Sequence, residues 1–75
     1  MKMTLTRKAA NLVGHNGYLF NDRLPDGRRS LKVYGWRLAQ YKRAADMLRM
    51  VGCDVRIKRG PFTMSECRLI VTEPK

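Results

Sequence analysis

The stretch WRLAQYKRAADMLRMV, residues 36–51, decides the fold. It contains neither Pro nor Gly, and at about 100° per residue a set of its apolar side chains falls within an arc of roughly 140°. This pattern predicts an amphipathic helix over 36–51, and Gly52 directly after it is typical of a helix C-terminus. The residues of the arc, which we expect to pack on a sheet, are Leu38, Tyr41, Ala44, Ala45, Leu48 and Val51.

Two segments after this helix predict a β-hairpin. In 53–59 and in 66–72 apolar residues occupy every second position, as in a strand with one buried face. Gly60 and Pro61 end the first of these segments. We expect both strands to turn their apolar side toward the helix and both thiols to be buried. The inward-facing residues are Cys53, Val55 and Ile57 in the first strand, and Cys67, Leu69 and Val71 in the second.

The segment before the helix predicts another hairpin, with strands over 18–21 and 28–34. The residues Leu24-Pro25-Asp26-Gly27 between them favour a turn, because Pro presets φ and Gly accepts a positive φ. In the return strand, Leu31 and Val33 share one face, whereas Lys32 and Tyr34 share the other.

The N-terminal residues complete the expected fold. Residues 1–6 alternate apolar and polar side chains, which predicts a short strand, and 7–13 are compatible with one or two helical turns. Together the elements predict an α+β fold, in which a small antiparallel sheet built from two β-hairpins packs against one main amphipathic helix over 36–51. The length of 75 residues predicts a single domain over 1–75.

Charge is the strongest indication of a partner. The chain has 16 Lys and Arg against 6 Asp and Glu, a formal net charge of +10. Such a surplus is typical of proteins that bind nucleic acid, and an anionic membrane or an acidic protein comes next, although the helix lacks the clean basic face of a membrane-surface helix. No apolar run approaches the roughly 18 residues of a membrane span. A domain this small has marginal stability, to which homodimerisation would add.

The two cysteines and the single histidine limit the metal sites that the chain can form. Cys53, Cys67 and His15 cannot supply the four ligands of a structural zinc site, so we expect neither metal nor cofactor. No apolar segment of about 7–15 residues near the start resembles a signal peptide. Cytoplasmic residence with reduced thiols is therefore the expectation.

Both hairpins carry basic side chains that suit a nucleic acid. A two-stranded ribbon fits the major groove, which favours duplex DNA over RNA. Arginine in the loop would reach phosphates or bases, an exposed tyrosine would stack, and the second hairpin would position phosphates. The residues expected to bind are Arg23, Arg28, Arg29, Lys32 and Tyr34 in the first hairpin, and Arg56, Lys58, Arg59 and Arg68 in the second, where Glu66 would neutralise part of the charge.

An alternative function rests on a second stripe of the helix. Trp36, Arg43, Met47 and Met50 fall together when the sequence is projected, away from the apolar arc. Such side chains are enriched at protein interfaces, so the chain would be a phage- or plasmid-type regulator that docks on an acidic protein. The competing interpretation is that the N-terminal segment folds over this stripe and buries it.

Catalysis has little support in the sequence. His15 stands in a turn of Gly and Asn residues, where it would be the general base of a small ribonuclease, but no partner residue stands at a fitting distance along the chain. The carboxylates are scattered and no phosphate-binding glycine motif is present. We therefore expect a binding protein without catalytic residues.

Overall fold

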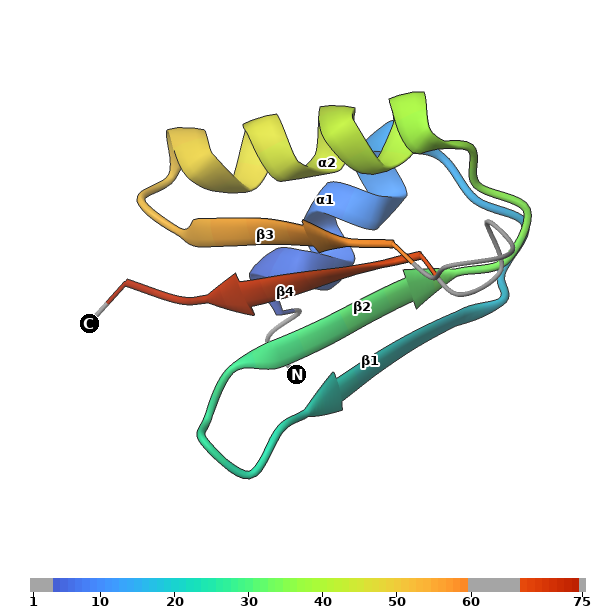
Figure 1. Ribbon diagram of the computed structural model, residues 1–75. Coiled ribbons are helices and arrows are strands. Elements are labelled where there is room, and N and C mark those ends of the chain that lie inside the picture. Colours follow the sequence, from blue (N-terminus) through green and yellow to red (C-terminus); the bar gives the residue numbers. More distant parts are fainter. Residues whose placement is uncertain (1–3, 60–66, 75) are drawn as a thin grey trace.

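The computed structural model describes residues 4–59 and 67–74. The four strands form one antiparallel sheet in the order β1-β2-β4-β3, which confirms both predicted hairpins. The expectation of one main helix is wrong in number, because a second helix precedes the sheet. The elements are α1 (Leu5–Val13), β1 (Leu19–Arg23), β2 (Arg29–Val33), α2 (Leu38–Met50), β3 (Asp54–Lys58) and β4 (Arg68–Thr72), as Figure 1 shows.

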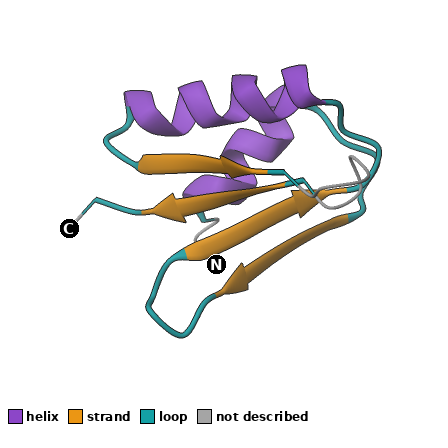
Figure 2. Cartoon of the chain, viewed as in Figure 1, coloured by secondary structure: helices purple, strands orange, loops and turns teal. Residues whose placement is uncertain are grey.

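Both helices cover the same face of the sheet and leave the other face open (Figures 1 and 2). Most apolar residues of β2, β3 and β4 that alternate toward the helices are almost fully buried, with Leu31 and Leu69 at the centre, whereas Ile57 is partly buried. Helix α2 contributes Tyr41 and Leu48 to this core, as its periodicity predicts, whereas Val51 lies past the end of the helix and is exposed. The open face is therefore the large surface that the helices do not use.

Helix α1 contains the helical turns expected over 7–13 and begins at Leu5, so Leu5 and Thr6 are helical and not part of the short strand that the alternation of 1–6 predicts. Residues 1–3 lie outside the described part of the chain, and Thr4 is the N-cap: its hydroxyl accepts a hydrogen bond from the Arg7 N–H. Ala9 and Ala10 are buried between α1 and the rest of the core. A cap and two small residues that allow close packing thus outweigh a period-two pattern only a few residues long.

Helix α2 begins two residues later than the periodicity suggests. Arg37 is its N-cap, with an extended backbone, and the Gln40 side chain accepts a hydrogen bond from the Arg37 N–H at 2.7 Å. Trp36 therefore precedes the helix, and a helical projection does not describe where its side chain points. With 13 residues, α2 is the longest helix in the described part of the chain, and none there is long and apolar enough to cross a membrane.

Candidate nucleic-acid interface

A row of basic side chains crosses the open face of the sheet. Lys58 on β3 lies opposite Arg68 on β4. The pairing of β2 with β4 ends at Leu31 and Leu69, and Lys32 and Arg68 are the residues directly beyond this last pair. Because successive side chains point to opposite faces and both leucines point to the helices, the three cations share the open face. The basic residues expected on the second hairpin thus continue onto the first hairpin through Lys32.

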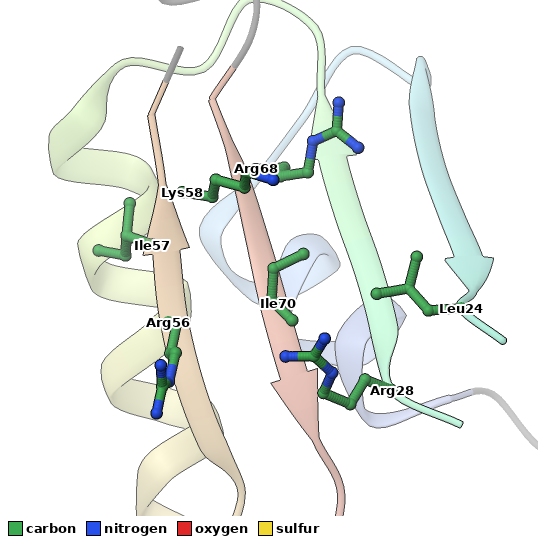
Figure 3. Close-up of a pocket in the computed structure, with 7 residues that line it drawn as sticks. All are labelled: Leu24, Arg28, Arg56, Ile57, Lys58, Arg68 and Ile70. Carbon is green, nitrogen blue, oxygen red and sulfur yellow. The ribbon is translucent and has the colours of Figure 1, made fainter. Parts of the chain in front are cut away.

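Next to this row, the open face is hollowed. Arg56 lies opposite Ile70, and these two residues form the next pair on the same face of the hairpin, two residues from the Lys58–Arg68 pair. The hollow has a volume of about 380 Å³, and its lining combines cations with aliphatic side chains (Figure 3). Such a lining suits a ligand with anionic groups and an apolar part. The residues that line it are Arg28, Arg56, Lys58 and Arg68 together with Leu24, Ile57 and Ile70.

The cations at the centre of the open face have no carboxylate partner among the described residues. The ion pairs found in that part of the chain are Arg28–Asp26, Arg29–Glu73 and Arg49–Asp46. Like charges directly opposite each other in a sheet, with Cβ atoms about 4.5–5.5 Å apart, destabilise the pairing unless an anion covers them. Glu66, which we expected to neutralise part of the charge of the second hairpin, lies outside the described residues.

Three exposed aromatic side chains stand at one corner of the sheet, where the basic row ends. Phe20 lies opposite Lys32 on the open face, and its ring meets the Tyr34 ring edge-on, with centroids 5.6 Å apart and planes at 70°. The Lys32 ammonium lies 5.3 Å from the centroid of the Tyr34 ring. Tyr18 is opposite Tyr34, whose N–H donates to the Tyr18 carbonyl. The corner thus combines aromatic faces with a cation.

Phe20 is a site residue that sequence reasoning missed. The strand over 18–21 was expected, but no face was assigned to its residues. The half-buried Leu19 lies opposite the buried Val33, and alternation then turns Phe20 outward. The sequence signal was strand alternation, since the residue after an inward-facing leucine points to the opposite face of the sheet.

In the loop of the first hairpin, Arg28 contacts a neighbouring carboxylate instead of being free. The Arg28 guanidinium contacts Asp26 through both Nε and Nη2, each at 2.7 Å. The backbone N–H of Arg28, followed by its guanidinium, lowers the pKa of Asp26 below its usual 3.8. Arg28 lines the hollow, but its charge is partly neutralised by this neighbour. The turn itself follows the sequence, with Gly27 at a φ of +90° after Pro25 and Asp26.

Three of the predicted basic residues belong neither to the row nor to the lining of the hollow. Arg29 lies opposite Val71, on the helix-covered side, and contacts Glu73 at 3.0 Å. Arg23 lies opposite Arg29 and shares that side. Arg59 follows the end of β3, and its charge opposes the rise that burial causes in the pKa of the Cys67 thiol. Arg59 is exposed, but because it lies past the end of β3, strand alternation does not place it in the row on the open face.

The helix layer is also basic, so the cations do not all gather on the sheet. Lys42 and Arg43 are exposed on α2, where Asp46 stands one turn further along. What distinguishes the open face is the direct apposition of cations on three strands beside exposed aromatic rings. The basic residues of the helix layer are Arg7, Lys8, Arg37, Lys42, Arg43 and Arg49.

The predicted protein-binding stripe of α2 is not one exposed surface. Trp36 is only 5 % exposed, and its indole N–H donates to the Gly14 carbonyl at the end of α1 at 2.8 Å. Met47 is half-buried against the core, whereas Arg43 and Met50 are exposed. The competing interpretation, that the N-terminal segment buries the stripe, therefore fits Trp36 but not Arg43 or Met50, and a contact centred on the Trp36 ring is not available on the surface.

Both ring nitrogens of His15 are engaged in local hydrogen bonds. Nδ1 accepts from the Gly17 N–H at 3.0 Å, so the proton of the neutral ring lies on Nε2, which donates to Asn11 Oδ1 at 2.7 Å. These bonds order the loop between α1 and β1. Within residues 4–59 and 67–74, no three His, Cys, Asp or Glu side chains gather as they would around a metal ion.

Comparisons of this chain with protein-family models, with curated proteins and with solved structures found no match. The functional inference therefore starts from the geometry and charge of the open face.

Proposed function

We propose that this protein binds nucleic acid on the open face of its sheet. The observation that carries the proposal is the apposition of Lys32, Arg68 and Lys58 on three neighbouring strands, with no carboxylate partner among the described residues. Arg56 adds a fourth cation at the rim of the hollow. A chain of phosphates relieves the repulsion between these charges and supplies an acceptor to each.

The chemistry of the face favours contact with the backbone of the nucleic acid. Guanidinium groups such as those of Arg56 and Arg68 bind phosphate oxygens through two parallel hydrogen bonds, and Lys58 acts as a point charge. Contacts of this kind position the ligand without reading its sequence. Ile70, between the cations, offers an apolar surface for a sugar or a base.

The expected preference for duplex DNA depended on the loop of the first hairpin entering a groove. Arg28 and Arg29 would supply its charge, yet each already contacts a carboxylate. The proposal therefore assigns the main contacts to the centre of the sheet and a smaller contribution to Arg28.

The salt dependence of binding tests the proposal. If four phosphates are neutralised, log affinity falls with log salt with a slope of about −3.6 on duplex DNA and about −2.8 on single strands. Lys58→Gln with Arg68→Gln removes two of these contacts, so we expect weaker binding and a slope about 1.4–1.8 shallower. Fluorescence anisotropy at several salt concentrations measures both quantities.

A matched control separates a site from general charge. Lys42→Gln with Arg43→Gln removes the same charge from the exposed side of α2, so we expect it to leave affinity and slope nearly unchanged. Equal weakening by the two double variants would show non-specific attraction to a basic protein. Undetectable binding of any nucleic acid near physiological salt would refute the function.

A further inference from the structure

We infer, on the basis of the proposed function, that the ligand is a single-stranded nucleic acid with a base stacked on Phe20 and its backbone laid along the basic row. A single strand can offer both a base face and a phosphate chain to one side of a sheet. On the open face, Phe20 offers a ring to the base and the neighbouring basic row offers charges to the phosphates.

The aromatic corner is the first support. Phe20 is 49 % exposed, Tyr34 46 % and Tyr18 69 %. The other aromatic residues in the described part of the chain, Trp36 and Tyr41, are buried in the core. A small domain gains by burying its aromatic rings, so leaving three of them exposed together indicates a surface with a partner.

The position of the corner is the second support. Phe20 on β1 lies opposite Lys32 on β2, and the row continues through Arg68 on β4 to Lys58 on β3. With neighbouring strands about 4.8 Å apart, this row measures about 14 Å from the ring to the last cation. A strand of nucleic acid running across the β-strands would place a base at Phe20 and its following phosphates over the cations.

The geometry of the rings favours a single strand over a duplex. In a duplex the bases stack on each other, so their faces are not available to a protein ring without unstacking. The Phe20 and Tyr34 planes also stand at 70°, which prevents one continuous stack from covering both rings. Because Lys32 lies over the Tyr34 ring, Phe20 is the main stacking surface. Tyr34 supports the Phe20 ring edge-on and takes a base that is not stacked on the neighbouring base of the strand.

The experiment compares four probes of the same length, about 15 nucleotides: oligo-dT, oligo-rU, a mixed-sequence duplex and an abasic DNA strand. The abasic strand keeps the phosphates but has no base to stack. For the wild-type protein we expect affinity for oligo-dT or oligo-rU to exceed that for the abasic strand about 5- to 150-fold, the range of one stacked base. The tighter of the two base-bearing strands identifies the sugar, and we expect the duplex to bind more weakly than that strand.

Variants assign the effect to the ring. Phe20→Leu keeps an apolar side chain on the exposed edge strand, so we expect the fold to persist, as checked by circular dichroism. It should weaken binding of the preferred single strand about 5- to 150-fold and leave binding of the abasic strand unchanged. Phe20→Tyr keeps a ring and serves as the matched control, with expected affinity within about twofold of wild type.

The outcomes distinguish this inference from the proposed function. If wild-type protein binds the abasic strand as tightly as the base-bearing strands, or if Phe20→Leu has no effect on binding, stacking is refuted. The proposed function then survives as long as Lys58→Gln with Arg68→Gln still weakens binding. If that double variant changes nothing on any probe, the basic face is not the site and both proposals fail.

Discussion

Tyr41 shows how one residue completes the backbone hydrogen bonding of the sheet. Its hydroxyl accepts from the Val33 N–H at 3.1 Å and donates to the Val33 carbonyl at 3.0 Å. The pairing of β2 with β4 ends at Leu31 and Leu69, so on that side Val33 has no strand partner. Burial raises the pKa of Tyr41 above its ordinary 10.0, in keeping with a hydroxyl that remains protonated in the core.

Replacing Tyr41 by Phe removes both hydrogen bonds while keeping the ring that packs edge-on against Trp36. The buried Val33 N–H then loses its partner, and the Val33 carbonyl keeps only the bond from the Trp36 N–H at 3.4 Å, so we expect the free energy of unfolding to fall by about 1–3 kcal/mol. Urea denaturation measures this change. Tyr34→Phe is the control, because the Tyr34 side chain is half exposed, and its effect should stay within about 0.5 kcal/mol. Equal stabilities for the two variants would contradict the assigned role.

At the scale of elements, a network of polar side chains docks α1 on β1. The Thr4 hydroxyl accepts from the Asn21 side-chain amide at 2.7 Å as well as from the Arg7 N–H at 3.2 Å. The buried Thr6 hydroxyl donates to Asn21 Oδ1 at 2.7 Å. Asn21 of the edge strand thus anchors the first turn of α1 through two side-chain hydrogen bonds.

Thr4→Ala removes the N-cap and one partner of Asn21 together. We expect the protein to lose at least the roughly 1 kcal/mol of a typical N-cap, with hydrogen exchange of the α1 amides accelerated more than that of the α2 amides. Thr4→Ser retains the hydroxyl and should restore most of the stability. If Thr4→Ala left the exchange of α1 unchanged, docking of the helix would not depend on this cap.

The elements differ in how well local sequence predicts them. Helix α2 and the β3–β4 hairpin follow from patterns that span many residues: a helical period in 36–51 and alternation on both sides of Gly60. Helix α1 does not, because its first residues alternate like a strand and its stability depends on Asn21, distant in sequence. Tertiary contacts therefore decide the shorter helix.

For the molecule as a whole, pH dependence follows from the buried thiols. Burial raises the pKa of Cys53 and of Cys67 above the ordinary 9.0, with the nearby charge of Glu73 adding to the effect at Cys53. A raised pKa in the folded state means that the unfolded chain loses these protons first as the pH rises. The stability that the neutral thiols contribute is therefore complete below pH 9.0 and declines above it.

We accordingly expect the free energy of unfolding to fall as the pH rises from 9.0 through the raised pKa values of the folded state. Urea denaturation at a series of alkaline pH values measures the slope. Cys67→Ala lowers stability at every pH but should make the slope shallower, since one linked proton is lost. An unchanged slope in that variant would show that other groups, such as Tyr41, dominate the alkaline transition.

The candidate site was predictable where strand alternation applied and not elsewhere. Lys32, Arg56, Lys58 and Arg68 face outward as alternation requires. The sequence did not reveal that the two hairpins pair through β2 and β4, which brings Lys32 beside Arg68. Only that pairing turns two separate groups of charge into one row across the sheet.

Local sequence was sufficient for the antiparallel α+β character of the chain, the faces of three strands and the surplus of positive charge, since these depend on neighbours a few residues apart. The order of the strands, the docking of α1, the burial of Trp36 and the ion pair of Arg29 with Glu73 were decided by tertiary structure. The physical reason is that side chains choose partners by distance in space, and residues such as Arg29 and Glu73 meet only after the sheet has formed.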